Sequence, residues 1–237
     1  MKKLSILLLL LLAISCGKKE HDLTIKGTVK GLKKGTIYLQ KISDTTLLAV
    51  DSVSIKGDSN FELHSALDTP EMFYLYLDKN DNSKNRLPFF ADKGYIEINT
   101  TLKNFVYDAK IIGSKQQEVL TEFKKMMTQF NNKSLDLIQA KFEAQQKQNN
   151  TRADSLQKVY DKYKKSRFKY ALNFGMNHLD SEVTPYIVLT EMYNANIKAL
   201  DTIYNNLDEK VITSKYGIQL KEFIEDVKSK EKENTKE

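Results

Sequence analysis

The spacing of apolar residues changes near residue 113, and this change constrains the fold more than any other feature. Before it, apolar residues alternate with polar ones, as at Leu23, Ile25 and Val29; after it, they recur every three or four positions. Alternation is typical of a strand with one buried face, and the longer spacing is typical of an amphipathic helix. The sequence therefore predicts an α+β protein, with a β domain at residues 23–113 and an all-helical domain at residues 114–227.

The β domain contains about eight predicted strands, the last of them over residues 105–112. Turns are expected at Gly31–Gly35, at Lys56–Asn60 and at Asp92–Gly94, the last as a hairpin turn. Short strands with turns at regular spacing are typical of an antiparallel β-sandwich or an open barrel. Pro88 has no N–H to donate to a ladder, so its strand is expected to be irregular or to lie at a sheet edge.

The segment Met72–Leu77 is apolar at nearly every position, so it presents an apolar surface on both faces of its strand. One face is expected in the core of the β domain. The other face could bind a ligand or a partner, or could pack beneath the helices, and we favour the packing interpretation.

The helical domain is predicted to begin with a long helix hairpin. Ser114 and Gln117 have the spacing of a capping box, and the polar segment Gln145–Asp154 is the expected bend. The two helices are expected to pack through their apolar stripes. In the first helix the stripe contains Val119, Phe123, Met126, Met127 and Phe130 and, after a change of spacing, Leu135, Ile138 and Phe142.

Three shorter helices are predicted after the hairpin. Thr184 and Pro185 have the composition of an N-cap followed by proline at the first helical position. Residues 228–237 are charged and lack apolar side chains, so we expect them to form a disordered tail.

The charge distribution argues against a nucleic-acid partner. The chain of 237 residues carries a formal charge of +6, to which Lys2 and Lys3 contribute. Basic and acidic residues are interspersed in both domains, and neither domain has the concentrated positive field that binds phosphates.

No residue is predicted to be catalytic, to bind a cofactor or to ligate a metal. A single cysteine excludes a Cys-x-x-Cys pair and any multi-cysteine zinc site. The phosphate-binding glycine motifs and the serine-hydrolase elbow are absent. Glu62, Glu71 and Glu97 lie on different predicted strands, and the sequence leaves open whether any of them meet in space.

The amino terminus has the features of a secretory leader. Lys2 and Lys3 precede the apolar run Leu4–Ile14. Eleven helical residues span roughly 16 Å, which is too short for a bilayer core of about 30 Å. We therefore predict a signal peptide at residues 1–15.

The end of this run, Ala13-Ile14-Ser15-Cys16, resembles the lipobox of bacterial lipoproteins, although a leucine usually stands where this chain has Ala13. The resemblance implies cleavage between Ser15 and Cys16 and a diacylglycerol on the Cys16 thiol. Residues 16–22 would then be a tether, and the membrane would be a partner through the lipid.

A second resemblance covers most of the chain after residue 22. It rests on the segments Leu23–Leu32, Gly35–Leu39, Asp51–Val53, Asn60–Leu63, Ile112–Ser114, Thr184–Tyr186 and Ser214–Gly217. These are similar to the uncharacterised β-rich N-terminal domain, with its helical segment, of Bacteroidota lipoproteins that continue into a thioredoxin-like oxidoreductase of the AhpC/TSA class. Catalysis in that class needs a Cys-x-x-Cys pair. This sequence has only Cys16, so no catalytic residue is carried over.

We therefore expect a lipid-anchored protein of the cell envelope, at the outer membrane and facing the periplasm or the cell surface. The leading hypothesis is a non-enzymatic binding or scaffolding module for a protein, peptide or glycan, without a cofactor. One alternative is an accessory subunit of a separate thioredoxin-like oxidoreductase. The other is a hydrolase whose carboxylates meet only in the folded chain.

Overall fold

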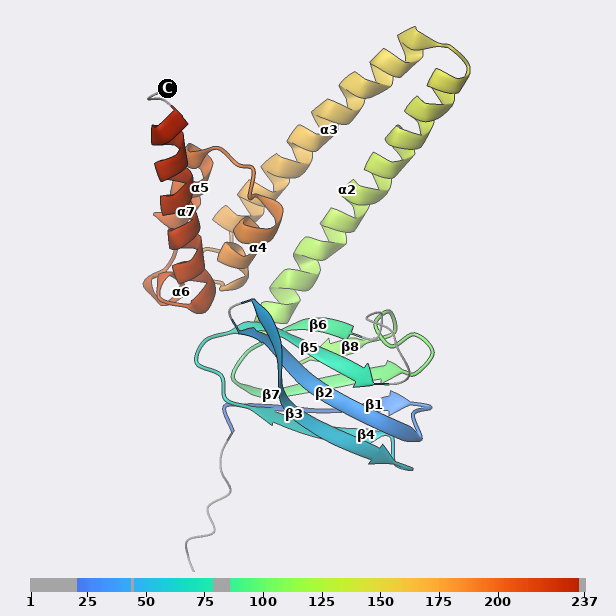
Figure 1. The fold of residues 1–237 in the computed structure, drawn as a ribbon, viewed down its shortest axis with the longest axis vertical. Coiled ribbons are helices and arrows are strands. Elements are labelled where there is room, and N and C mark those ends of the chain that lie inside the picture. Colours follow the sequence, from blue (N-terminus) through green and yellow to red (C-terminus); the bar gives the residue numbers. More distant parts are fainter. Residues whose placement is uncertain (1–20, 44, 79–85, 235–237) are drawn as a thin grey trace, which may run out of the picture.

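The computed structural model describes residues 21–43, 45–78 and 86–234. Figure 1 shows a β-sandwich with all the described helices on one side of it. The sandwich contains the strands β1 (Leu23–Lys30), β2 (Lys34–Ser43), β3 (Thr46–Lys56), β4 (Asn60–Ser65), β5 (Glu71–Asp78), β6 (Arg86–Ala91), β7 (Gly94–Thr101) and β8 (Lys110–Ile112). The predicted α+β class and the sandwich architecture are confirmed.

The strands form two four-stranded sheets. The first sheet has the order β4-β1-β7-β8 and the second has the order β3-β2-β5-β6. All pairs are antiparallel except β1 with β7, which is parallel. The turn at Asp92–Gly94 joins β6 to β7, which belong to different sheets, so the expected hairpin there is wrong. The residues Asp92–Gly94 indicate a turn, but a turn signal does not determine whether the next strand joins the same sheet or the other one.

The core of the sandwich consists of the alternating apolar residues of both sheets. Leu23, Ile25 and Val29 of β1 have no exposed surface, and Phe73 and Phe89 are equally buried. Burying an aliphatic or aromatic side chain of this size contributes about 1.5–3 kcal/mol to the free energy of folding. The alternation predicted from sequence is therefore the pattern that holds the two sheets together.

The last strand is shorter than predicted, whereas Pro88 lies where it is expected. Residues 103–108 form turns, so the last strand covers only Lys110–Ile112 instead of 105–112. Phe105 is nevertheless buried, and its carbonyl accepts a hydrogen bond from Thr100 Oγ1 at 2.7 Å. Pro88 lies in β6, an edge strand, as predicted.

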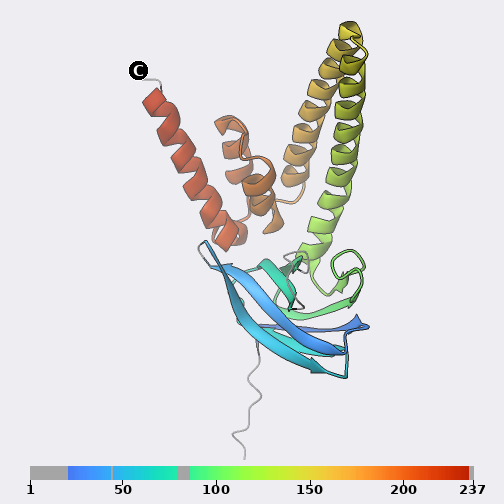
Figure 2. The same ribbon diagram turned by 45° about the vertical axis from the view of Figure 1, so that its right-hand side comes forward.

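The helical domain consists of α2 (Lys115–Gln146), α3 (Asn150–Met176), α4 (Val183–Glu191), α5 (Ile197–Tyr204), α6 (Glu209–Ile212) and α7 (Lys215–Asn234). The helices α2 and α3 form the predicted antiparallel hairpin, and Figure 2 shows the hairpin and α7 diverging above the sandwich. Near the sandwich the hairpin has an aromatic seam, in which Phe130 lies 5.1 Å from Tyr163 and Phe123 lies 5.2 Å from Phe174, between ring centroids.

The far half of the hairpin differs from the prediction. Leu135, Ile138 and Phe142, expected in the seam, are exposed by 64%, 49% and 58%, and the buried positions are Leu137 and Ala144. The helix continues without interruption, so the buried face recurs seven and fourteen residues after Phe130. The change of spacing in the sequence therefore moves the large apolar residues to the outer face.

Two helix ends also differ. The helix α4 begins at Val183, and Thr184 Oγ1 donates to the carbonyl of His178 at 2.6 Å, so Thr184 is not the N-cap. The helix α7 continues to Asn234, so the predicted disordered tail is wrong for residues 228–234. Lys228 contacts Asp201 of α5 at 2.7 Å, and Lys230 contacts Asp226 at 2.6 Å. These ion pairs extend α7 past its last apolar turn.

Candidate functional site

The predicted processing site cannot be placed, because Ser15 and Cys16 lie outside the described residues. Among the described residues, no group of three or more His, Cys, Asp or Glu side chains is arranged to hold a metal ion. None of the described helices is long and apolar enough to cross a membrane.

The three glutamates singled out in the sequence divide between two places. Glu62 and Glu97 lie on the outer face of the first sheet, and both line one hollow there. Glu71 is buried at the junction of the two domains. Strand order determines this division, because β4 and β7 are both neighbours of β1, whereas β5 belongs to the second sheet.

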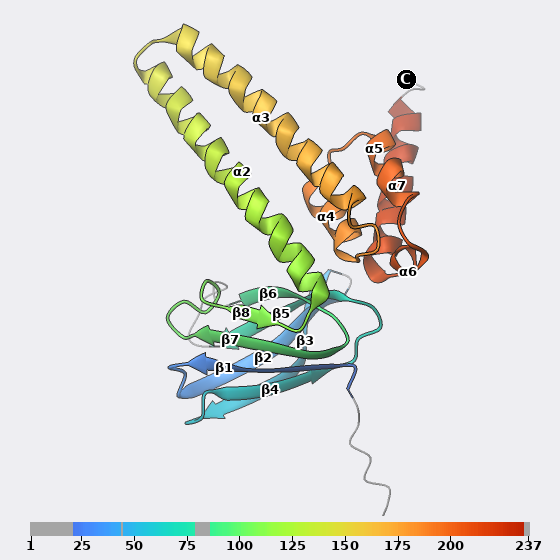
Figure 3. The same ribbon diagram turned by 180° about the vertical axis from the view of Figure 1, so that it is seen from behind.

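The outer face of the first sheet, which faces the viewer in Figure 3, is built from three rows of side chains across β4, β1 and β7. The rows are Glu62–Lys26–Glu97, Asn60–Thr28–Asn99 and His64–Thr24–Tyr95. Side chains alternate along each strand, so these residues point outward because their neighbours fill the core. We call these nine side chains the outer-face rows.

The outer-face rows are held in place by contacts among themselves. Lys26 and Glu62 form an ion pair at 2.9 Å, and Asn99 Nδ2 donates to Glu97 Oε1 at 2.5 Å. Thr28 Oγ1 donates to Asn60 Oδ1 at 2.6 Å, and the Thr28 N–H donates to Asn99 Oδ1 at 3.1 Å. These bonds hold the polar groups in fixed positions.

A hollow of about 540 Å³ lies over these rows. Its lining includes the six side chains of the two rows that contain Lys26 and Thr28, together with Tyr95. The Tyr95 side chain is half exposed. The hollow therefore combines carboxylates, amides, a hydroxyl and an accessible aromatic ring in one concave surface.

Gly27 allows the strands under the hollow to approach closely. A Cβ atom at this position would lie 1.7 Å from the carbonyl oxygen of Ile98 in β7 and 3.0 Å from the ring of Phe61 in β4. No side chain fits at that distance, so the parallel pairing of β1 with β7 requires glycine here.

His64 and His178 have structural contacts. His64 lies at the end of the outer-face rows, where Thr24 Oγ1 lies 3.2 Å from its Nδ1 and the ring of His21 stacks on it at 4.3 Å. His178 stacks on Phe174 at 4.1 Å, and its Nδ1 lies 2.8 Å from the carbonyl oxygen of that residue.

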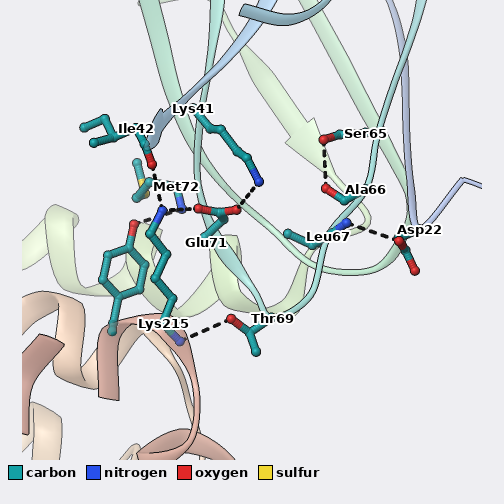
Figure 4. A network of polar contacts seen from close by, with 11 residues as sticks. Asp22, Lys41, Ile42, Ser65, Ala66, Leu67, Thr69, Glu71, Met72 and Lys215 are labelled. Atoms are coloured by element: carbon teal, nitrogen blue, oxygen red, sulfur yellow. Dashed lines mark hydrogen bonds and ion pairs between the residues drawn. The ribbon is translucent and has the colours of Figure 1, made fainter. Parts of the chain in front are cut away.

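The junction between the domains contains a second polar cluster, shown in Figure 4. Glu71 is only 5% exposed and forms ion pairs with Lys41 at 2.9 Å and with Lys215 of α7. Lys215 Nζ also donates to the carbonyl of Ile42 at 2.8 Å. Because both oxygens of the buried carboxylate have a cationic partner, this cluster fastens α7 to the second sheet.

Apolar and aromatic residues surround that cluster. Met72 and Phe90 turn away from the sandwich core and join the core of the helical domain, where Phe90 contacts the rings of Tyr186 and Tyr216. Tyr216 Oη accepts a hydrogen bond from the Met72 N–H at 3.1 Å. Burial raises the pKa of both tyrosine hydroxyls, so they stay protonated. At Met72, the expected packing beneath the helices is present.

The start of α2 binds the edge strand β6 through side chains. Ser114 caps the helix as predicted, by accepting from the Gln117 N–H at 2.9 Å. Its hydroxyl also donates to the Phe90 carbonyl at 2.8 Å, and Gln117 Oε1 accepts from the Phe90 N–H at 2.7 Å. The Gln117 side chain therefore binds the sheet, whereas the predicted capping box has it bonding back to the backbone of Ser114.

Two further carboxylates lie beside this contact. Asp92 accepts from the backbone N–H of Lys115 at 2.7 Å, and Gln116 donates through its side chain to Glu182 at 2.5 Å. Burial raises the pKa of Asp92 and of Glu182. Asp92 Oδ1 is buried without a hydrogen-bond partner. The junction thus contains two carboxylates that are costly to ionise.

The β domain corresponds to a known family model. Residues 23–120 match a domain of unknown function, DUF4369. The match covers the whole sandwich and the first residues of α2, including Ser114 and Gln117 with their contacts to β6. No curated protein matches the chain.

Proposed function

We propose that this protein is a lipid-anchored, non-enzymatic binding module of the cell envelope. The anchor is supported by the Met1–Lys3 and Leu4–Ile14 segments before Cys16. The binding role is supported by the hollow over the outer-face rows, whose polar side chains are held by hydrogen bonds and which lies away from the domain junction. This hollow is the observation on which the proposed function rests.

The cellular setting belongs to the same proposal. The β-rich domain resembles that of Bacteroidota lipoproteins that carry a thioredoxin-like domain, and the DUF4369 match covers the same strands. On the resemblance, we propose that the protein acts at the outer membrane, facing the periplasm or the cell surface, as a binding or scaffolding component.

Two experiments test this function. Cys16→Ala should move the protein from the membrane fraction to the soluble fraction and abolish labelling with a radioactive fatty acid; unchanged fractionation would contradict the anchor. Crosslinking in native membranes, with a photoreactive residue at Thr28 and a control at the exposed Tyr107, should capture a partner only at Thr28. Equal capture at both positions would contradict binding through the hollow.

The resemblance supports one second candidate, an accessory role beside a separate thioredoxin-like oxidoreductase. The partner would then supply the cysteine pair, and this chain would present the substrate. Copurification of such an enzyme through the outer face supports this role, and its absence from every crosslinked species would exclude it.

The hydrolase alternative has one observation in its favour, because Glu62 and Glu97 line the same hollow. Glu62 is paired with Lys26, and Glu97 accepts from Asn99. Hydrolysis of a bound saccharide that is lost in Glu97→Gln would favour this alternative over a binding module.

A further inference from the structure

We propose that the hollow on the outer face binds an uncharged saccharide. This inference rests on the proposed function, and it adds the chemical class of the ligand. The residues that line the hollow fit a neutral saccharide better than an anion or a peptide.

Charged ligands fit the lining poorly. Two carboxylates and one ammonium group line the hollow, and the ammonium of Lys26 is paired with Glu62 at 2.9 Å. A phosphate, a sulfate or a uronate would meet two carboxylates and a single ammonium group, and like charges repel at short range. Anionic polymers, including nucleic acids, are therefore disfavoured.

A peptide bound as an added strand does not fit either. Peptides that extend a sheet need a free edge, where backbone N–H and C=O groups are unpaired. The hollow lies over β1, which is hydrogen-bonded on both sides, to β4 and to β7. The strand β4 is the edge of this sheet, and there the His64 N–H already donates to the Asp51 carboxylate at 2.7 Å. Its lining mixes polar groups with apolar surface from Val53, Phe61 and the Tyr95 ring.

A polyhydroxylated ligand matches the remaining groups. The Thr28 hydroxyl gives its proton to Asn60 and can still accept a hydrogen bond. The amides of Asn60 and Asn99 each use one N–H within the protein, so the second N–H and a carbonyl lone pair remain for sugar hydroxyls. The carboxylate of Glu97 adds a strong acceptor. The half-exposed ring of Tyr95 provides a flat apolar surface at the border of the hollow, against which the C–H face of a sugar ring can pack.

The geometry also favours an extended chain over a single small molecule. The hollow is open, and the rows continue past Tyr95 to Thr24 and His64. An oligosaccharide can follow these rows across three strands, whereas an isolated sugar would use only part of them. We therefore expect the affinity to rise with the length of the saccharide.

The test uses the full chain purified in detergent and a panel of neutral oligosaccharides of glucose, mannose, xylose and N-acetylglucosamine. Oligogalacturonate and heparin fragments serve as anionic comparisons. We expect at least one neutral oligosaccharide to bind, with an affinity that changes little with salt concentration. Binding by the anionic saccharides alone, or by no saccharide of the panel, would overturn the proposal.

Matched variants locate the binding. Tyr95→Ala and Asn99→Ala should each weaken it by about ten-fold or more, which is about 1.4 kcal/mol. Tyr107→Ala removes a tyrosine that is 93% exposed and does not line the hollow, and it should leave affinity unchanged. Tyr95→Phe keeps the ring and should retain binding, which separates lost stacking from misfolding. Equal affinity in Tyr95→Ala and Tyr107→Ala would refute the site.

The outcome also separates the ligand class from the function. If a partner crosslinks at Thr28 in membranes but no neutral saccharide binds, the ligand class is wrong and the binding module remains. If saccharide binds but Cys16→Ala stays in the membrane, the anchor is wrong and the binding site remains.

Discussion

The β-sandwich and the far half of the helix hairpin bury apolar residues very differently. In the sandwich, Phe73 and Phe89 have no exposed surface and lie in one continuous core. In the far half of the hairpin, Leu137 and Ala144 are buried, while Leu135 and Phe142 are exposed. Stability is therefore expected to be concentrated in the sandwich and at the junction, with the hairpin end opening more easily.

The largest effect should come from truncating a phenylalanine in each region. Phe89→Ala removes a fully buried ring and should lower the free energy of unfolding by about 3–5 kcal/mol. Phe142→Ala, the matched change in the hairpin, should alter it by no more than about 0.5 kcal/mol. Denaturant titration of both variants measures the contrast, and similar losses would show that the two regions unfold as one unit.

The next effect concerns the contact that joins the regions. Glu71→Gln leaves Lys41 and Lys215, each about a quarter exposed, without their carboxylate, and should cost about 2 kcal/mol. Asp226→Asn, which breaks an exposed ion pair within α7, should cost at most about 0.5 kcal/mol. Proteolysis between the domains should accelerate only in Glu71→Gln; equal protection in both variants would contradict a fastening role.

A pair of glycine substitutions sharpens the comparison further. Gly27→Ala should destabilise the sandwich by about 1–3 kcal/mol, because its Cβ would overlap the Ile98 carbonyl. Gly175→Ala in α3 meets only ordinary contacts of 3.4 Å and above, so helix propensity should make it neutral or stabilising by up to about 1 kcal/mol. Thermal unfolding followed by circular dichroism gives the sign of the stability change in each variant. A Gly27→Ala variant as stable as the unchanged protein would refute the close approach of β1 to the Ile98 carbonyl.

The smallest effect is a pH dependence at the junction. Burial raises the pKa of Asp92, so its stabilising contribution is present in the protonated state and is lost as pH rises through the raised value. Glu182 acts in the same direction. Asp92→Asn should therefore reduce the loss of unfolding free energy between about pH 4 and pH 7. An unchanged slope would show that Asp92 ionises at its ordinary pKa.

The sequence predicts individual helices and strands better than it predicts which of them contact one another. The Ser114 cap and the edge position of Pro88 follow from the chemistry of single residues, and both were correct. The contact of Gln117 with Phe90 was not predictable, because it depends on which strand lies at the edge beside α2. Leu135 is exposed although its apolar side chain predicts a place in the seam, because the uninterrupted helix turns that position to the outer face.

The hollow could not be predicted from the sequence, because it depends on which strands pair. Lys26, Glu62 and Glu97 are far apart in the chain, and they meet only because β1 pairs with β4 on one side and with β7 on the other. Alternation did indicate that each of them faces outward. It could not indicate that β7, separated from β1 by five strands, would be its parallel neighbour.

The binding of α2 to β6 has a consequence for self-association. A strand at the edge of a sheet is a template for pairing with another chain. Here the Phe90 N–H and C=O are occupied by Gln117 and Ser114, and the helices cover Met72. A fragment that ends at Ile112 would leave this edge unpaired and apolar, so it should aggregate through β6. The helical domain thus blocks strand pairing at that edge.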